Sequence, residues 1–264
     1  MTESDSTQRP TPAWRREYLS EIDSTNLELL RRASQGELPG LVLVADHQTA
    51  GRGRLGRTWQ APAKSSLLVS VLLKPGIAQA DLGLVPIASG LALAQALENS
   101  APFKPGLVWP NDVFGARGKI AGILVESVFE QAELQCLVIG AGVNLLQKKG
   151  DFSPEIRRRA SSLWEETGKK VGREELLENY LEKLGYWLGV VERGGAEAVV
   201  EKYGGYDIIA GSEVRLLQEG REIFAVARGI DAKGRLRAEV SGSEKSFGAG
   251  EIIQIRRSSD AAGD

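Results

Sequence analysis

Cysteine and histidine are almost absent from this chain of 264 residues, which has one of each, Cys136 and His47. A disulfide within the chain is therefore impossible, and a structural zinc site would lack ligands. Cys136 lies in the apolar run 136–139, where a small buried hydrophobic side chain is expected. Because a buried thiol is a poor nucleophile, a catalytic Cys–His pair is not favoured.

Long hydrophobic runs and an excess of charge are absent as well. No apolar run approaches the ~20 residues that span a bilayer. The polar N-terminal segment contains two prolines and no apolar signal region. A formal net charge of −2 does not indicate a protein that binds nucleic acid or an anionic membrane through its overall charge. These absences predict a cytoplasmic protein without a membrane segment.

Periodicity along the chain predicts both helices and strands. Strands are expected at 41–45, 66–73, 120–128 and 133–139, with a turn at 140–142, and helices at 84–98 and 173–192. A first helix is expected from a cap at Ser24 or Thr25, which has capping-box spacing to Glu28, to a stop at Gly36. Helices and strands do not alternate one for one, which predicts an α+β fold with a mixed β-sheet packed against helices.

The pattern changes near residue 211. Short strands alternate with glycine turns from there on, at 213–217, 222–230, 235–240 and 252–255. Such a pattern is typical of a small all-β module. The expected organisation is a disordered leader at 1–15, a large domain at 16–210, the β module at 211–257 and a disordered tail at 258–264.

The stretch from Gly51 to Trp59 contains three glycines, three arginines and a tryptophan in nine residues. Glycine lets the backbone adopt positive φ and approach a ligand closely, and arginine adds fixed positive charge with paired donors. This composition predicts a loop that closes over an anion. A mobile, solvated basic surface loop is the alternative, since short glycine motifs occur by chance.

The stretch also satisfies the G-x-G-x-x-G pattern, but its context excludes the usual meanings. A dinucleotide site needs the first glycine directly after a strand and a helix at the last one, with an acidic residue about 20 positions on. None of these is present. A kinase would need an H-R-D loop, and His47, the sole histidine, lies upstream of the motif. The Walker A sequence is missing too.

Further motifs occur in a fixed order around this loop. They are Asp23-Ser24-Thr25-Asn26, Gln48, Trp109-Pro110-Asn111-Asp112, the segment Lys119–Glu126, and Gly140-Ala141-Gly142-Val143-Asn144-Leu145. In content and order they resemble the biotin–protein ligases, from Asp23 to Asn144, and more loosely at Ser161-Ser162-Leu163 and in the β module. The resemblance implies a catalytic domain like those of class II synthetases and a small C-terminal SH3-like β-barrel.

The resemblance also implies a two-step reaction. The carboxylate of biotin attacks the α-phosphate of ATP, with Mg²⁺, to give biotinyl-5′-AMP and pyrophosphate. A lysine of a biotin carboxyl carrier protein domain of a carboxylase then attacks the anhydride and releases AMP. Biotin and ATP are substrates, and no tightly bound organic cofactor is implied. A homodimer through the sheet of the large domain is a further expectation.

The family's site residues carry over onto matching positions. Lys119, Arg54 and Arg57 would be catalytic, because joining two anions requires positive charge at the phosphate. Biotin would contact Ser24, Thr25, Asn26, Gln48, Gly51, Arg52, Gly53, Arg54, Trp59, Lys119, Gly122 and Gly140. The nucleotide would contact Arg54, Arg57, Trp59, Asn111, Asp112, Lys119 and Asn144. Asp112 could hold Mg²⁺ on the ATP phosphates or position the acceptor lysine.

Each of these residues also has a structural alternative. Thr25 could be a plain helix cap, Trp59 a core side chain, and Lys119 a solvated lysine at the start of a strand. Gly122 and Gly140 could mark a bulge or turn. Asp112 could bond its own turn, and Asn144 could simply end a strand.

One position departs from the family pattern. A lysine usually precedes the Trp-Pro-Asn-Asp motif, and here that position is Val108. Either Arg117 or another basic residue replaces the missing charge, or the affinity for the nucleotide differs.

Three other functions compete with the ligase hypothesis. A ligase that is also a repressor would need a winged-helix domain before Asp23, and about 20 residues are too few for one, so no DNA binding is expected. A lipoate or octanoyl ligase or transferase has the same broad fold. A biotin-binding adaptor that has lost catalysis is the third alternative.

Overall fold

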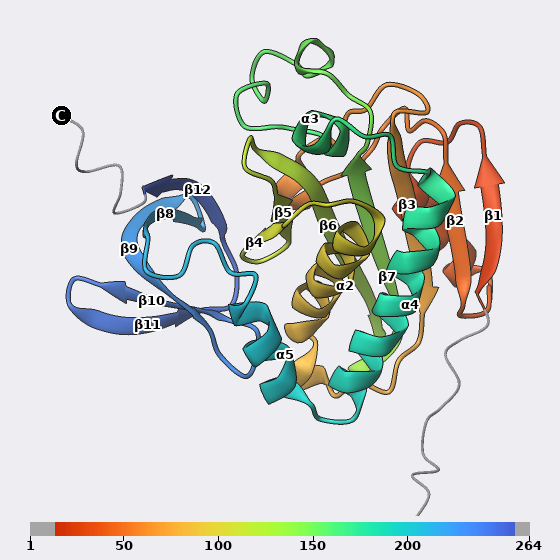
Figure 1. Ribbon diagram of the computed structural model, residues 1–264. Helices are drawn as coiled ribbons and strands as arrows, with labels where there is room; N and C mark the ends of the chain where they lie inside the picture. Colours follow the sequence, from red (N-terminus) through yellow and green to blue (C-terminus); the bar gives the residue numbers. More distant parts are fainter. Residues whose placement is uncertain (1–13, 257–264) are drawn as a thin grey trace, which may run out of the picture.

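The computed structural model describes residues 14–256, which form a large α+β unit and a smaller all-β unit (Figure 1). The predicted tail at 258–264 and nearly all of the predicted leader lie outside the described residues. Contrary to the expectation for the leader, Arg15 already begins the first strand.

A seven-stranded sheet forms the centre of the large unit. Its strands are β1 (Arg15–Leu19), β2 (Leu41–Ala45), β3 (Ser66–Leu73), β4 (Gly106–Val108), β5 (Asp112–Phe114), β6 (Lys119–Glu130) and β7 (Glu133–Asn144). They lie in the order β1-β2-β3-β7-β6-β5-β4. Only β1 and β2 pair in parallel, and the other neighbours are antiparallel. The predicted α+β fold with a mixed sheet is therefore confirmed.

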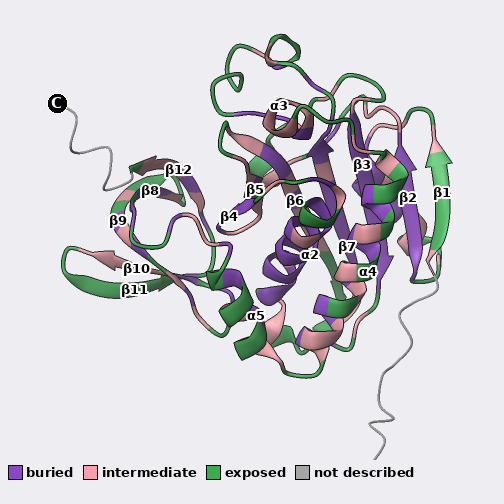
Figure 2. Ribbon diagram, viewed as in Figure 1, coloured by how far each residue is buried: buried purple, intermediate pink, exposed green. Residues whose placement is uncertain are grey.

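Two long helices cover one face of this sheet (Figure 1). They are α2 (Leu84–Ser100) and α4 (Arg173–Glu192), and the shorter helices are α1 (Thr25–Ser34), α3 (Leu163–Thr167) and α5 (Ala196–Gly204). The helix α2 is apolar on most of its surface and almost completely buried (Figure 2), as expected for a helix between a sheet and other helices. The predicted limits of α4 agree with the structure, and those of α2 differ by two residues.

The opposite face of the sheet is covered only in part. There α1 packs on a small cluster that includes Leu29, Leu43, Cys136 and Val138, so the expectation of a buried cysteine is confirmed. Ser24 caps α1 and accepts from the N–H of Leu27. The expected capping box of Thr25 and Glu28 is wrong by one residue, and the side chain of Thr25 is free for other contacts.

The predicted turn at 140–142 is wrong, because β7 continues through it to Asn144. Gly140 pairs with Ser70 and Leu124, and Gly142 pairs with Leu68 and Gly122. Glycine is needed at positions 140 and 142 because other parts of the chain pack directly against the backbone there, and not because the chain turns.

The C-terminal unit is a five-stranded antiparallel sheet, which confirms the predicted β module. Its strands are β8 (Glu213–Gln218), β9 (Arg221–Ile230), β10 (Leu236–Val240), β11 (Ser243–Phe247) and β12 (Glu251–Arg256), in the order β11-β10-β9-β8-β12. The indole N–H of Trp109 donates to the carbonyl of Gly234 at 2.9 Å. Trp109 is buried, so this residue of the Trp-Pro-Asn-Asp motif joins the two units.

Candidate active site

A pocket occupies the partly covered face of the sheet, beside α1. Cross-strand rows of β3, β7 and β6 form its floor, with Ser70, Gly140 and Leu124 in one row and Leu68, Gly142 and Gly122 in the next. The glycine-arginine stretch, the loop 152–160 and the start of β12 form its walls. Segments that are distant in the sequence therefore meet around one hollow.

Trp59 lies on the glycines of this floor. A Cβ atom at Gly142 would be 2.5 Å from Cε2 of Trp59, and one at Gly122 would be 3.2 Å from Cζ3. Real Cβ contacts of 2.5 Å do not occur, so Gly142 must be a glycine while Trp59 lies there. The indole nitrogen of Trp59 is buried and has no hydrogen-bond partner among the described residues. Trp59 is thus a wall of the pocket and not a core side chain.

Polar side chains gather where the start of α1 meets the floor. The backbone N–H and the hydroxyl of Thr25 both donate to Oε1 of Gln48, at 2.8 and 3.0 Å. The hydroxyl of Ser70 lies 2.7 Å from that of Thr25. Asn26 donates to Oε2 of Glu126 at 2.9 Å. Since these groups lie in a mostly buried environment, they hold each other in fixed orientations.

Two of the predicted glycines serve the protein's own structure in this region. A Cβ at Gly140 would lie 2.1 Å from Oδ1 of Asn26, so Gly140 makes room for Asn26. A Cβ at Gly51 would lie 2.4 Å from the carbonyl oxygen of Trp59, and the N–H of Trp59 donates to the carbonyl of Gly51 at 2.9 Å. Gly51 does not line the pocket, and it closes the base of the glycine-arginine loop.

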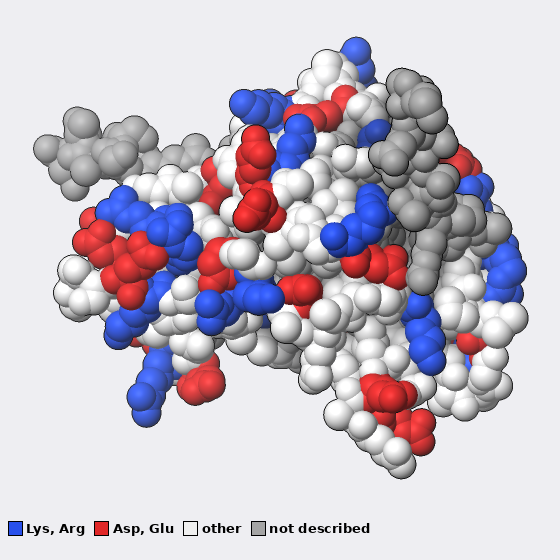
Figure 3. Space-filling model, turned by 90° about the horizontal axis from the view of Figure 1, so that it is seen from below, with Lys and Arg blue, Asp and Glu red and all other residues white. Residues whose placement is uncertain are grey.

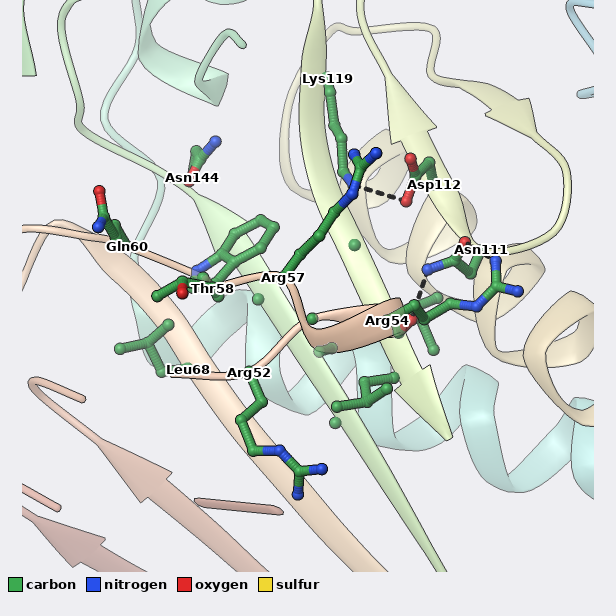
Figure 4. Close-up of a pocket in the computed structure, with 18 of the residues that line it drawn as sticks. Arg52, Arg54, Arg57, Thr58, Gln60, Leu68, Asn111, Asp112, Lys119 and Asn144 are labelled. Atoms are coloured by element: carbon green, nitrogen blue, oxygen red, sulfur yellow. Dashed lines mark hydrogen bonds and ion pairs between the residues drawn. The ribbon is translucent and has the colours of Figure 1, made fainter. Parts of the chain in front are cut away.

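The loop itself is held together by its backbone. Besides the closure at its base, the N–H of Gly53 donates to the carbonyl of Arg57 at 2.7 Å. A short 3₁₀ turn, η1 (Arg54–Gly56), forms the tip. Leu55 at the tip has a φ of 54° and is 69% exposed, an uncommon conformation for a branched residue. Arg52 and Arg57, which flank this tip, extend in opposite directions (Figure 4).

Three cations of the pocket lie beside carboxylates. Arg52 pairs with Glu126 at 3.0 Å and Arg57 with Glu251 of β12 at 2.6 Å. Lys119 pairs with Asp112 at 2.7 Å between Nζ and Oδ1 (Figure 4). All three pairs are partly exposed, and a phosphate or carboxylate of a ligand could replace or share these carboxylate contacts.

Arg54 differs from these cations because it donates only to neutral oxygens. Its guanidinium contacts Oδ1 of Asn111 at 3.0 Å and the carbonyl of Gly250 at 3.2 Å. Burial lowers the pKa of Arg54, and the nearby carboxylates of Asp112 and Glu251 oppose that shift. Arginine nevertheless stays charged at any physiological pH. Arg54 therefore brings positive charge into the pocket with no carboxylate of residues 14–256 in direct contact.

The backbone fixes Lys119 on both sides. Its N–H donates to the carbonyl of Arg159 at 2.7 Å, and its carbonyl accepts from Ser161 at 2.8 Å. Its Nζ lies 5.9 Å from the centre of the Trp59 ring, at the outer limit of a cation–π contact. Lys119 begins β6, as expected, but its side chain points into the pocket and is not simply solvated.

Asn144 and Asn111 are anchored by the protein. Asn144 ends β7, donates to the carbonyl of Ser161 at 3.0 Å and accepts from Gln147 at 3.1 Å. Asn111 donates to the carbonyl of Ile123 at 2.7 Å. Each amide keeps further hydrogen-bonding capacity, so a structural role and a ligand contact are compatible.

Comparison with known proteins identifies the family. The model of the Biotin/lipoate A/B protein ligase family matches residues 18–144, and that of the biotin protein ligase C-terminal domain matches residues 209–253. The chain is 33% identical over 254 residues to the biotin–[acetyl-CoA-carboxylase] ligase of Mycobacterium tuberculosis, covering 92% of this chain and 90% of that one. The chain belongs to the biotin protein ligases.

Other members of the biotin protein ligases agree with this assignment. The bifunctional ligase/repressor BirA of Escherichia coli is 34% identical over 234 residues, covering 88% of this chain and 71% of that protein. The biotin protein ligase of Aquifex aeolicus in complex with biotin and ATP has 32% identity and a TM-score of 0.80, covering 92% of this chain and 99% of that one. The fold expected from the sequence is the fold of this family.

Within this biotin protein ligase, neither Val108 nor Arg117 contributes its side chain to the pocket. Val108 is buried in β4. Arg159 does line it, and its guanidinium donates to the carbonyl of Ile253 in β12 at 2.7 Å. Sequence reasoning missed Arg159, although the run Arg157-Arg158-Arg159 was a signal of locally concentrated charge.

Sequence reasoning missed other residues of the pocket as well. They are Ser70 at the polar end, Gly142 under Trp59, and Phe152, Glu251 and Ile252 in the walls. Glu126, which pairs with Arg52 and accepts from Asn26 beside the pocket, was missed too. Ser70 and Glu126 lie within apolar strands, where alternation would have placed them on the same face as the glycines. Glu251 and Ile252 come from the other unit, and nothing in the sequence indicates that contact.

Asp112, the carboxylate expected to contact a metal carried by ATP, lines the pocket beside Lys119. Among residues 14–256, no three His, Cys, Asp or Glu side chains gather into a metal site. A magnesium ion that arrives with ATP takes much of its coordination from phosphate oxygens and water. A single carboxylate such as Asp112 therefore fits that role.

None of the described helices is long and apolar enough to cross a membrane.

Proposed function

We propose that this protein activates biotin with ATP to form biotinyl-5′-AMP and transfers biotin to a lysine of a biotin carboxyl carrier domain. The observation that carries the proposal is the division of one pocket into two chemically different ends. Hydrogen-bonding side chains at α1 form one end, and Arg54, Lys119 and Arg57 form the other. Biotin has a polar ureido ring at one end and a carboxylate at the other, and the carboxylate must react with a phosphate of ATP.

In this proposal the polar end binds the ureido ring. Ser24, Thr25 and Gln48 offer donors and acceptors that are already oriented by Ser70 and by each other. The ring would enter between this end and Trp59, with the carboxylate directed towards Lys119. Fixed polar groups recognise a ligand at a lower ordering cost than mobile ones.

The first step joins the carboxylate to the α-phosphorus of ATP and releases pyrophosphate. Both reactants are anions, so positive charge must be present before they meet. This charge must stabilise the pentacoordinate phosphorus of the transition state more strongly than it stabilises the reactants. Arg54 brings charge with no carboxylate of the described residues in contact, and Lys119 is fixed through its backbone. Mg²⁺ bound with ATP, beside Asp112, would neutralise part of the phosphate charge.

The second step breaks the anhydride. The uncharged amine of the acceptor lysine attacks the carbonyl carbon of biotinyl-5′-AMP and forms the new C–N bond. The bond to the phosphate oxygen breaks, AMP leaves with the bonding electrons, and the nitrogen loses a proton to solvent to give the neutral amide. Asp112 could orient that amine through a hydrogen bond, because its carboxylate lies at the same end of the pocket as Lys119. Trp59 and the loop around Leu55 would limit the access of water to the adenylate.

A pyrophosphate assay tests the activity and its specificity. The purified protein is incubated with MgATP and either biotin or lipoate, and pyrophosphate release and acyl-adenylate formation are followed. Biotin-dependent release is expected. Release with lipoate alone would favour a lipoate ligase, and biotin binding without any adenylate would indicate an adaptor protein.

In this proposal the protein acts in the cytoplasm and does not bind DNA.

The protein is further proposed to form a homodimer through the sheet of the large unit. Beyond Gly122, β6 has no partner strand on its outer side among the described residues, and Val128 and Phe129 are exposed there. An open strand edge with apolar side chains favours pairing with a second copy. Light scattering after size exclusion measures the mass, and a monomer at all concentrations would contradict this.

A further inference from the structure

Two loops lie beside the mouth of the pocket, residues 115–118 between β5 and β6 and residues 145–162 between β7 and α3. They carry an unusual amount of positive charge that is not in ion pairs. Arg117, Lys148, Arg157 and Arg158 are exposed, and none has a carboxylate within ion-pair distance among the described residues. Elsewhere most exposed arginines are paired, as Arg31 is with Asp23, for example. The face seen from below likewise shows blue and red side chains next to each other (Figure 3). We call these four cations the basic surface.

The nearby carboxylates of these loops and of α3 form no ion pair with the basic surface among the described residues, because they bind backbone amides instead. Asp151 accepts from the N–H of Lys148 at 2.9 Å, and Glu165 from that of Lys149 at 3.1 Å. Glu166 accepts from the N–H groups of Ala116 and Arg117, at 3.0 and 3.1 Å. These bonds shape the loops and leave the guanidinium and ammonium groups directed to solvent.

Glu155, the remaining carboxylate of these loops, hydrogen-bonds with Ser153. The guanidinium of Arg157 donates to the carbonyl of Phe152 in its own loop, a neutral group. The hydrogen bond from Ser153 lowers the pKa of Glu155, and the charge of Arg157 lowers it further. Among the described residues, however, no carboxylate of the two loops lies within ion-pair distance of the basic surface.

The basic surface is continuous with the pocket. The two loops that carry it are joined by the backbone bonds of Lys119 to Arg159 and Ser161. Arg159 and Ile156 of the same loop line the pocket, and Ile156 is 42% exposed. By contrast, the four cations of the basic surface do not line the pocket, so they lie outside the space where a nucleotide would bind.

We infer that the basic surface is the docking site of the acceptor protein and that it selects acceptors with acidic side chains around the target lysine. This inference rests on the proposed function and adds the chemistry of the partner to it. The acceptor is the one substrate too large for the pocket, and its lysine must enter through the mouth. A protein of net charge −2 would repel an acidic partner, except at a local basic surface that steers it to the mouth. Ile156 gives that contact an apolar centre.

Charge reversal separates this docking role from a role in the first step. Arg117→Glu and Arg158→Glu change side chains with no hydrogen bond to the rest of the described chain. The double variant should form biotinyl-5′-AMP and release pyrophosphate at the normal rate without acceptor. Its kcat/KM for biotin transfer to an acidic carrier domain should fall about tenfold or more at low salt, mainly through KM. Added sodium chloride should slow the wild type and leave the double variant nearly unchanged.

Arg193→Glu is the matched control for the single variant Arg158→Glu, because it makes the same charge change just after α4, at the end of that helix far from α3 and the basic surface (Figure 1). It should leave transfer unchanged. Equal losses in Arg193→Glu and the single variant Arg158→Glu would overturn the inference in favour of net charge. Slower pyrophosphate release in the double variant would assign these cations to the nucleotide. Unchanged transfer together with lost binding of double-stranded DNA would assign them to nucleic acid. Absence of pyrophosphate release in the wild type would instead contradict the proposed function.

Discussion

Trp59 and Gly142 are in direct contact, with the indole ring against the backbone of the strand, so that a Cβ at position 142 would lie 2.5 Å from the ring. The contact sets the depth of the pocket on this side. It also explains why a strand in the centre of a sheet contains a glycine, a residue that weakens strands in general.

Gly142→Ala should therefore displace Trp59. Overpacking costs about 1–3 kcal/mol of the free energy of unfolding, and the affinity for biotin should fall because a wall of the pocket has moved. Urea denaturation and the fluorescence of the tryptophans measure both effects. Gly204→Ala is the control, since a Cβ there meets no atom within 4 Å. If Gly142→Ala bound biotin normally, Trp59 would not form part of the site.

Lys119→Ala tests the assignment of the central cation. The first step should slow by about 2–4 kcal/mol of transition-state stabilisation, by analogy with the loss of an oxyanion donor. Biotin binding should remain measurable by calorimetry, because the polar end of the pocket is unchanged. Lys183→Ala, a change at a lysine of α4 that does not line the pocket, is the control. Near-normal pyrophosphate release by Lys119→Ala would contradict the mechanism.

Arg159→Gln should weaken the binding of the nucleotide and leave the binding of biotin unchanged. Arg159 lines the pocket and donates only to a neutral carbonyl, so its charge is available to a phosphate. Loss of one charge-assisted hydrogen bond raises the KM for ATP about tenfold. Arg158→Gln, the adjacent change outside the pocket, should leave this KM unaltered. The same KM in both variants would exclude Arg159 from the nucleotide site.

The pH dependence of stability should include a contribution from Asp23. A hydrogen bond from Arg31 holds the pKa of Asp23 down at about 2, below its ordinary value of 3.8. Because the folded-state pKa is lowered, the charged form stabilises the fold above pH 4, and that stabilisation is lost as the pH falls towards 2.

Asp23→Asn should thus lose stability near neutral pH and approach the wild type in acid. Denaturation in urea at a series of pH values between 2 and 7 measures this. Glu201→Gln, at an exposed carboxylate outside any ion pair among the described residues, should follow the wild-type curve. A constant difference between Asp23→Asn and the wild type at every pH would show that Arg31 does not act through charge.

Sequence patterns predicted the long elements well and the short ones poorly. The stripe of α4 and the apolar run of β3 are strong signals, since many residues agree. The strands β4 and β5 have three residues each, and β11 is almost entirely exposed, so neither length nor alternation reveals them. The glycines at 140 and 142 read as a turn because the sequence does not show Asn26 and Trp59 lying against them.

The site was predictable where a motif is local. Except for Gly51, every residue predicted to contact biotin or the nucleotide lines the pocket. What the motifs could not predict is the contribution of distant segments, above all Arg159 and the start of β12. Those contacts depend on how the two units pack, and that packing has no local signal.

The C-terminal contacts of Arg54 and Arg159 have an evolutionary consequence. Both arginines donate to main-chain oxygens, that of Ile253 in β12 and that of Gly250 immediately before this strand. A main-chain oxygen is present whatever side chain its residue carries, so the side chain at position 253 can change without loss of the hydrogen bond from Arg159. Glu251, which meets Arg57 through its own side chain, is the position there where drift should be least tolerated.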